Sequence, residues 1–585
     1  MKIIPPLVGA ALLCLCACRS RPIQTDLPRS EPSCKADIAV VAVQSVPPVG
    51  TEDDLTVEVF LQNRSPRPVT FVGAKLDGES LPPLRGKTQE VLRVFDVEGL
   101  PRRRLPLKPV AGARWWQFYP SATLAAHGFA AFQVNFAGRS HSCRLELTTA
   151  DGENLSVAIP AYCPSARRIV HLGVTGDGGR LTVAYSAGTS PTSVRLNGAA
   201  VSFRVLRPAD AGRSGAVIAA PPRSICEGEP LFVELAFADG VRCFGLVRAL
   251  CGIFTVAPDG WDESRSIPAA ERNRYGFDAD IRVGRLPLDA VCDDARAGVC
   301  GNSSRTVVAA RCAHDRAKPS ALCGVDICTA IQPSTWNIYA SIADAVFLKP
   351  YKMHWGANAA RFIDEEDTFL GEKVAAVAPR PAVWIPERFR EGCELEGTEF
   401  EILAWSALLR GVRAIRVHHW MNDRREPFAG NPGLAESVRR FNAALNRNRR
   451  LLETLIPAGA RTVRNGSVQV LEGWCADEGV LLLVRNLDYE TGIDHKNRVR
   501  RHPFRARQKL DVSIPYTPPP WLKAERAVDF QSGEKLAVER KENLLRIDLP
   551  TLSDFRLIYL PNILAEEYPL NRERALSQSL RLGLP

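Results

Sequence analysis

Between residues 251 and 460, short apolar segments alternate with segments of helical period, and this alternation constrains the fold most. Strands separated by helices of ten or more residues form parallel βα units, because parallel strands need a long crossover. About six strands are expected here, whereas a closed barrel of this kind has eight and takes roughly 250 residues. Either the first turns of the barrel are short and irregular, or the barrel is incomplete. The expected strands are CGIFTVAPDGW, RLPLDAVCDD, ALCGVDIC, AVFLKPYKM, PAVWIP and VRAIRVHHW.

Segments of β type flank this region on both sides. They are rich in Val, Phe and Thr and are punctuated by Gly, Pro, Asn and Asp, as is typical of sandwich strands. The expected fold class is multidomain α/β plus β, with a (β/α)8-type barrel, complete or incomplete, between N-terminal β-sandwich domains and a C-terminal β-sandwich. The expected parts are 36–163 (β-sandwich), 164–250 (second β domain), 251–460 (barrel-like domain), 461–562 (C-terminal β-sandwich) and 563–585 (tail).

The chain begins MKIIPPLVGAALLCLCAC, with Lys2 followed by an apolar stretch that is too short to span a bilayer comfortably. Such a stretch fits a signal peptide, here residues 1–17. The ending LCAC resembles a bacterial lipobox, which implies cleavage before Cys18, lipidation of Cys18 and a polar, Pro-rich tether over 18–35. An ordinary secretory signal cut nearby is the alternative. We therefore expect an exported lipoprotein, anchored to a membrane of the bacterial cell envelope.

The chain has 16 cysteines, and 13 remain when Cys14, Cys16 and the predicted lipidation site Cys18 are set aside. An exported chain meets oxidising conditions, so some of these should pair, and an odd number leaves at least one thiol free. The pairs Cys226–Cys243 and Cys292–Cys300 would form short-loop bridges.

Several classes of function find no support in the sequence. The net charge of +10 is modest for 585 residues and no basic stripe is interleaved with aromatic residues, so no nucleic-acid partner is expected. Phosphate-binding glycine motifs and the GxSxG elbow are absent from the sequence, and no cofactor is expected. The spacing of Cys323 and Cys328 is not that of a zinc knuckle, so no metal site is expected.

The second half of the chain resembles a known family of enzymes. Its segments follow the rhythm of the beta-galactosidase-like (β/α)8 glycosidases, the group that includes glycoside hydrolase family 42, and a terminal sandwich follows them. The resemblance is one of pattern and implies a glycosidase barrel. The segments that carry it are AVFLKPYKM, PAVWIPERF, TEFEILAWSALLRGVRAIRVHHW and the long helix to LLETLIP.

This resemblance implies two catalytic acids, one after the fourth strand and one after the seventh. With VRAIRVHHW as the eighth strand, Glu387 takes the nucleophile position, and Asp293 or Asp294 the acid/base position where the family usually shows Asn-Glu. Such carboxyl groups lie about 5 Å apart for retention and about 6.5–9.5 Å apart for inversion. Asp294 is preferred because it lies further toward the loop. The alternatives are a surface ion pair of Glu387 with Arg388 or Arg390, and a loop cap for the aspartates.

Aromatic and histidine side chains follow the sixth and eighth strands. Ring faces stack on the apolar faces of sugars, so we expect these residues to bind the substrate; packing at the rim is the alternative. Asp326 is read as a structural strand residue or a further acid, and Lys349 and Lys352 as solvated lysines or as ligands of an anionic substituent. The predicted substrate-binding residues are Tyr351, His354, Trp355, His418 and Trp420.

Three hypotheses of different classes follow. The first is a lipid-anchored glycosidase that acts on an oligosaccharide or polysaccharide with two carboxylates. The second is a lipoprotein that binds glycan on a degenerate barrel without cutting it, which the short barrel and the Asp-Asp pair favour. The third is a structural envelope protein whose β domains mediate assembly. Whether the chain is an enzyme depends on the geometry of the carboxylates.

Overall fold

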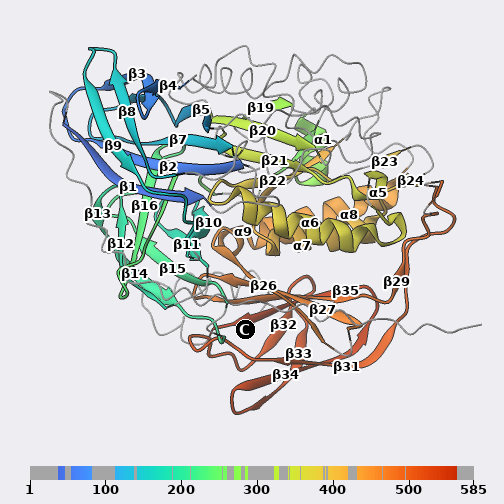
Figure 1. Ribbon diagram of the computed structural model, residues 1–585. Helices are drawn as coiled ribbons and strands as arrows, with labels where there is room; N and C mark the ends of the chain where they lie inside the picture. The colour runs from blue at the N-terminus through green and yellow to red at the C-terminus, as the bar shows by residue number, and fades with distance from the viewer. Residues whose placement is uncertain are drawn as a thin grey trace, which may run out of the picture.

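The computed structural model places β-rich parts on both sides of a layer of parallel strands and helices (Figure 1). The N-terminal β sheets lie beside this layer, and the C-terminal sheet lies below its helices. The residues described are 37–46, 54–81, 112–137, 141–165, 167–186, 189–210, 213–252, 255–259, 269–277, 283–287, 322–328, 340, 343–355, 357–386, 389–390, 393–418, 431–463, 466–494, 496–497 and 499–562.

The central sheet has six strands, all parallel, in the order β18-β25-β22-β21-β20-β19. The first strand of the unit therefore lies beside the last, as it does where a barrel closes. Between β18 and β19, the described residues form one helix, α1 Ala269–Tyr275. The bounds are β18 Thr255–Asp259, β19 Val283–Pro287, β20 Leu322–Cys328, β21 Ala345–Lys349, β22 Ala382–Trp384 and β25 Val412–His418.

The predicted multidomain architecture of α/β plus β parts is confirmed, whereas a closed eight-stranded barrel is not shown. Within the described residues, β18 and β19 are not paired with each other, although a closed barrel would require neighbouring strands to pair all around.

Three long helices cover one face of this sheet (Figure 1). They are α6 Phe362–Val377, α7 Gly397–Leu409 and α8 Pro432–Arg447. The α7 helix is buried on nearly every side because it lies between the sheet and the C-terminal part. Its Trp405 ring lies 4.7 Å from the ring of Phe441 and 5.9 Å from the ring of Phe530, measured between centroids. One core thus unites the sheet, the helices and the C-terminal sheet.

Along the chain, the shorter helical elements lie in the connections between the strands and the long helices. They are α1 Ala269–Tyr275, α5 Lys352–Trp355, the 3-10 turn η3 Ala359–Arg361 and α9 Arg449–Leu452. Two short strands, β23 Phe389–Arg390 and β24 Cys393–Glu394, form a hairpin between β22 and α7. Among the described residues, no helix combines the length and the apolar character that crossing a bilayer requires.

The N-terminal half consists of antiparallel sheets. Alternate residues are buried in β3, β8 and β9, which is the pattern of strands with one face toward a core, whereas β11 is buried throughout. The first pair of sheets contains β1 Ile38–Val46, β2 Asp54–Asn63, β7 Phe129–Ala137 and β5 Gly112–Tyr119, and β4 Glu79–Ser80, β3 Val69–Leu76, β8 Cys143–Thr149 and β9 Asn154–Ile159, with β6 Thr123–Leu124 beside β3. The second pair contains β10 Ile169–Val174, β11 Leu181–Tyr185, β15 Gly215–Ala220 and β14 Ser202–Leu206, and β13 Ala199–Ala200, β12 Pro191–Leu196, β16 Pro230–Phe237 and β17 Arg242–Arg248.

The C-terminal part is an eight-stranded antiparallel sheet with a separate hairpin. It shares a core with the second pair of N-terminal sheets, since Ala184, Leu206 and Ala216 pack among its strands. Its strands are β26 Leu455–Val463, β27 Val468–Cys475, β28 Gly479–Asn486, β31 Lys509–Tyr516, β32 Ala527–Asp529, β33 Lys535–Lys541, β34 Leu544–Leu552 and β35 Phe555–Pro561, and the hairpin is β29 Tyr489–Glu490 with β30 Arg505–Ala506.

The predicted disulfide between Cys226 and Cys243 is wrong, because both thiols are free. Cys243 points from β17 into the core, whereas Cys226 lies exposed in the turn before β16. Cys323 on β20 does form a disulfide. Cys292 and Cys300 lie outside the described residues.

Candidate functional site

The two faces of the parallel sheet differ in what covers them. On one face, Val325, Leu348 and Ile415 belong to the core shared with the helices. On the other face, which we call the inner face, Phe347, Val383 and other residues form a small separate apolar cluster. Side chains alternate between the faces along each strand, so sequence position decides which face a residue joins. The apolar cluster of the inner face contains Leu322, Ala345, Phe347, Val383, Ile385 and Ala414.

Toward the carboxyl ends of the strands, the inner face carries charged side chains. Asp326 of β20 and Lys349 of β21 form an ion pair of 3.1 Å, with exposures of 0% and 3%. Arg416 of β25 lies with its guanidinium 5.9 Å from the ring centroid of Phe347. Burial of a charge is costly unless the charge is paired, so the pairing of Asp326 with Lys349 is what allows both charges to be buried on the inner face. The carboxyl ends of parallel strands are also where functional groups gather in βα barrels.

The opposite, amino end of the sheet holds a different polar cluster that joins three parts of the chain. Tyr119 of β5 donates from its hydroxyl to Asp344 Oδ1 at 2.8 Å and accepts from the backbone N–H of Arg248 at 2.9 Å. Asp344 also accepts from the backbone N–H of Cys323 at 2.8 Å, and the guanidinium of Arg380 stacks on the Tyr119 ring. All of these partners are buried, so these contacts stabilise the amino end of the sheet.

The predicted catalytic residues Glu387, Asp293 and Asp294 lie outside the described residues, as do Trp420 and the predicted lipidation site Cys18. The structure therefore leaves the carboxylate pair as a prediction.

The predicted substrate-binding residues are described in part. Tyr351 lies two residues after the end of β21, with its backbone in the left-handed region at φ 45°. His354 and Trp355 belong to α5, and His418 ends β25 beside Asp259 in the parallel register. The structure thus brings these four residues to the carboxyl end of the sheet, and for His354, Trp355 and His418 only the backbone is placed.

Sequence reasoning missed a buried carboxyl group behind this end of the sheet. Glu366 of α6 accepts a hydrogen bond of 2.9 Å from the indole N–H of Trp384, the last residue of β22. Burial raises the pKa of Glu366 to about 7 against the opposing effect of that hydrogen bond. The signal was present in the sequence, since Glu366 falls in the apolar stripe that Phe362, Phe369 and Leu370 define at helical spacing.

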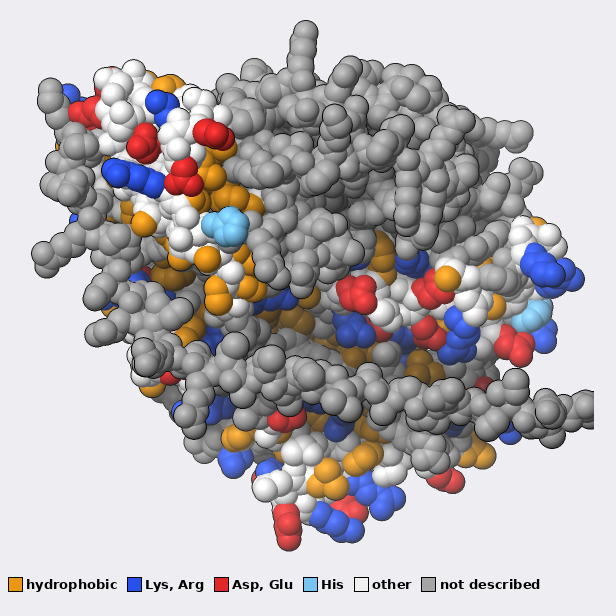
Figure 2. Space-filling view, in the orientation of Figure 1, with side chains coloured by type: hydrophobic (Ala, Val, Ile, Leu, Met, Phe, Trp, Pro, Cys, Tyr) orange, Lys and Arg blue, Asp and Glu red, His pale blue; other side chains and the backbone are white. Residues whose placement is uncertain are grey.

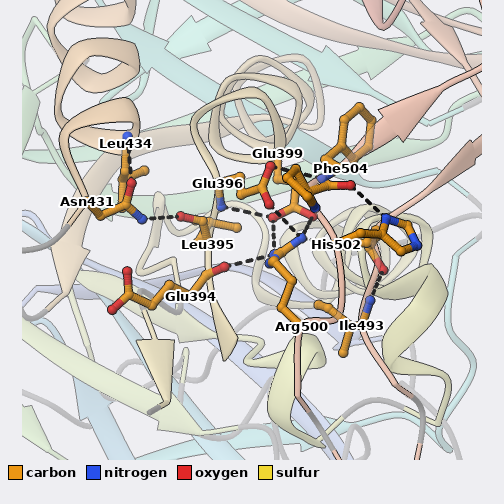
Figure 3. A network of polar contacts seen from close by, with 12 residues as sticks. Glu394, Leu395, Glu396, Glu399, Asn431, Leu434, Ile493, Arg500, His502 and Phe504 are labelled. Carbon is orange, nitrogen blue, oxygen red and sulfur yellow. Dashed lines mark hydrogen bonds and ion pairs between the residues drawn. The ribbon is translucent and has the colours of Figure 1, made fainter. Parts of the chain in front are cut away.

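A second buried carboxyl group lies at the start of α7 (Figure 3). Glu399 binds Arg500 through contacts of 2.7 and 3.0 Å, and Arg500 also lies 3.1 Å from Glu396. Burial raises the pKa of Glu399 to about 7, although the positive charge of Arg500 opposes this shift. The guanidinium also donates to the backbone carbonyl of Glu394 at 2.8 Å. This network fixes the end of the connection between β22 and α7, the connection that contains residue 387.

Within the described residues, no group of three His, Cys, Asp or Glu side chains is placed to hold a metal ion. The described Lys and Arg side chains on the face in Figure 2 lie among Asp and Glu over the helical layer and the C-terminal sheet. The charge of this face is mixed, as on an ordinary protein surface.

Comparisons with known proteins do not assign the chain to a family. No family model matches it, and no curated protein matches it. Among solved structures, a candidate alpha-galactosidase (melibiase) from Bacteroides fragilis is 11% identical, with a TM-score of 0.24 over 64% of this chain and 96% of that chain. The Thermotoga maritima alpha-fucosidase is 12% identical, with a TM-score of 0.20 over 45% and 71%. A Bacteroides thetaiotaomicron alpha-L-fucosidase is 9% identical, with a TM-score of 0.22 over 45% and 71%.

These solved structures are described as glycosidases, but TM-scores this low carry no argument about the fold or function of this chain.

Proposed function

We propose that the protein is an exported glycoside hydrolase that acts on an oligosaccharide or polysaccharide with two carboxylates. The observation that carries the proposal is the inner face of the parallel sheet, which is apolar at its amino end and charged at its carboxyl end through the buried pair Asp326–Lys349. The parallel pairing of β18, the first strand of the sheet in the sequence, with β25, the last, supports a barrel-like arrangement around that end.

In this proposal Asp326 is the ion-pair partner of Lys349, at 3.1 Å, rather than the acid or the nucleophile. The proposed nucleophile is Glu387, three residues after β22 in the sequence, and the proposed acid/base is Asp294 or Asp293. The acid has to stay protonated near neutral pH, which burial or the charge of its partner can achieve. The proposed sugar-binding residues Tyr351, His354, Trp355, His418 and Trp420 would stack on the substrate.

The second candidate function is glycan binding without cleavage. The neutralised state of Asp326 favours it, since the inner face then depends on other carboxylates for any chemistry.

Turnover of a panel of 4-nitrophenyl glycosides tests the proposal. The variants are Glu387→Gln and, as a matched control, Glu394→Gln, an exposed carboxylate in the same connection between β22 and α7. We expect Glu387→Gln to lower kcat by about a thousandfold, as loss of a nucleophile or general base does, and Glu394→Gln to leave it within about twofold. Equal rates in wild type and Glu387→Gln would remove Glu387 from the mechanism.

Affinity electrophoresis in gels that contain soluble polysaccharides decides between the two candidates. Retardation of wild type without turnover of any glycoside would favour binding alone. Turnover of one panel member would favour the hydrolase.

We further propose lipidation at Cys18 and residence in the bacterial cell envelope. The lipobox-like ending LCAC supports this, and so does the disulfide at Cys323, since disulfides persist in oxidising compartments. Incorporation of a clickable fatty acid into wild type, and its loss in Cys18→Ala, is the expected result. Equal incorporation in both would place the anchor elsewhere.

A further inference from the structure

The start of α6 contacts two segments that reach the carboxyl end of the sheet. Figure 1 shows α6 beneath β21 and β22, on the helix-covered side. One of the two segments is α5, Lys352–Trp355, which directly follows Tyr351 and begins three residues after the end of β21. The other is the end of β22 at Trp384. Both contacts run through the same side chain, Glu366.

Glu366 receives one hydrogen bond from each segment. The indole N–H of Trp384 donates to Glu366 Oε1 at 2.9 Å, and both side chains are buried. The backbone N–H of Lys352 also donates to the Glu366 carboxyl group. A carboxylate offers two acceptor oxygens, whereas an amide offers one acceptor oxygen and an NH2 group that only donates. Glu366→Gln therefore places a donor where the carboxylate has an acceptor.

Further contacts hold α5 and the turn after it against α6. The ammonium of Lys352 lies 4.5 Å from the ring centroid of Phe369. The neighbouring carboxylate Glu365 accepts from the backbone N–H groups of Ala357 and Asn358 at 2.9 and 2.6 Å. The acidic first turns of α6 thus bind the segment 352–358 at both of its ends.

The backbone just before this segment is strained. Tyr351 has φ 45°, a left-handed conformation that a bulky side chain rarely adopts and that persists only where the surroundings impose it. The next residue along the chain, Lys352, is the one whose N–H Glu366 accepts. Strained residues of this kind cluster at binding sites, where they fix the direction of a side chain.

We propose that Glu366 is a positioning residue, which fixes α5 and the end of β22 and so sets the geometry of the sugar-binding residues Tyr351, His354 and Trp355. This inference rests on the proposed function, because it assigns those three residues to a glycan site. Glu366 itself lies on the helix-covered side and acts through the segments it holds. The raised pKa of its carboxyl group, about 7, reflects the burial that this position requires.

The test compares wild type, Glu366→Gln and Glu401→Gln. Glu401 is a matched control: it is a buried glutamate of the same helical layer, on α7, and its partners are Arg440 and Gln531 rather than α5 or β22. Hydrogen exchange of a peptide that covers residues 349–356 is measured first, since it needs no ligand. We expect exchange in Glu366→Gln to be faster by about tenfold, as the loss of one hydrogen bond implies, and exchange in Glu401→Gln to match wild type.

The second measurement uses the 4-nitrophenyl glycoside that wild type turns over fastest. We expect Glu366→Gln to raise KM by about tenfold with kcat within about twofold, because it displaces binding residues and leaves the proposed acids in place. Glu366→Asp, which keeps the charge and shortens the reach by one methylene, replaces Glu366→Gln if the latter does not fold.

Each outcome decides something. Unchanged exchange in the 349–356 peptide would overturn the proposal, whatever the glycosides show. Faster exchange with unchanged KM and kcat would also overturn it and leave Glu366 a structural residue. If wild type neither turns over a glycoside nor binds a polysaccharide, the proposed function fails, and exchange alone still decides whether Glu366 holds the segment.

Discussion

Lys349 and Asp326 lie on neighbouring strands with almost no exposure to solvent, and each compensates the charge of the other. The net energy of such a pair is small, but the cost of breaking it is large, because removal of one partner leaves the buried charge of the other uncompensated. The sequence alone left Lys349 between a solvated lysine and a ligand for an anion. The structure shows a third arrangement, in which Lys349 forms an ion pair with Asp326 on the neighbouring strand.

We expect Lys349→Met to lower the free energy of unfolding by about 3–5 kcal/mol, because it leaves the Asp326 carboxylate buried without its cation. The double variant Lys349→Met, Asp326→Leu should recover most of this loss, because it removes both charges. Urea unfolding followed by tryptophan fluorescence measures the change. Equal losses in the single and double variants would show that the pair is not coupled.

The pH dependence of stability at Glu366 follows from its folded pKa of about 7, against an ordinary value of 4.5. Because the folded pKa is raised, the folded protein keeps a proton that the unfolded chain releases. The contribution of this proton to the free energy of unfolding is fully present below about pH 4.5 and is lost as pH rises through 7. The free energy of unfolding falls by about 3 kcal/mol over this range. Thermal unfolding at pH 5 and pH 8 should therefore show Glu366→Gln gaining on wild type as pH rises. A constant difference would contradict the assigned titration.

At the scale of elements, α7 depends on a side chain from a distant hairpin. Arg500 lies between β29 and β30, yet it binds Glu396 and Glu399 at the start of the helix (Figure 3). The start of α8 lies in the same network, where Asn431 accepts from the backbone N–H of Leu434 at 3.0 Å. Two helix starts and one hairpin are thus fixed together on the side of the sheet where the connection after β22 runs.

We expect Arg500→Leu to destabilise the protein by about 3–5 kcal/mol, since Glu399 would stay buried without its cation. Limited proteolysis should then cut the hairpin region 490–505 faster. The neighbouring Arg501→Leu is the control: Arg501 pairs with Asp494 at the surface, and surface pairs are worth about 0–1 kcal/mol. Equal cleavage of both variants would show that Arg500 does not hold the hairpin.

Within the described residues, strands lie where the alternation predicted them in CGIFTVAPDGW, ALCGVDIC, AVFLKPYKM, PAVWIP and VRAIRVHHW. The helix α1 ends at Tyr275 and is followed by Gly276 at φ 67°, the left-handed conformation with which glycine commonly ends a helix. Strand order was not predictable in this way, because it depends on contacts between distant segments. The roles of Glu366 and Arg500 were hidden for the same reason, since their partners are 18 and about 100 residues away.

At the scale of the whole molecule, His171 lies where three parts of the chain meet. It belongs to β10 in the N-terminal half, and it packs against Arg413 of β25 and the backbone of Leu455 of β26. Arg413 in turn donates to the carbonyls of Glu453 and Leu455 at 3.0 and 3.3 Å. Burial, reinforced by the Arg413 charge, lowers the pKa of His171 well below its usual 6.5.

This contact should make the junction sensitive to acid. Because the folded pKa of His171 is lowered, the unfolded chain binds a proton that the folded protein excludes, so the stability contributed is present above about pH 6.5 and is lost as pH falls below it. We expect His171→Gln to flatten the fall in the unfolding temperature between pH 7 and pH 5. The exposed His127, replaced in the same way, should leave the fall unchanged. A His171→Gln profile that parallels wild type would contradict the prediction.

The pairing of β18 with β25 has a consequence for synthesis on the ribosome. These two strands open and close the α/β part, yet they pair with each other, across a separation of more than 150 positions. When a nascent chain has left the ribosome only as far as β22, β25 has not yet emerged. The edge of β18 that pairs with β25 is therefore still unpaired. Pairings of such long range close slowly, and their waiting strands are exposed to wrong partners. Completion of this part should therefore coincide with the emergence of Val412–His418.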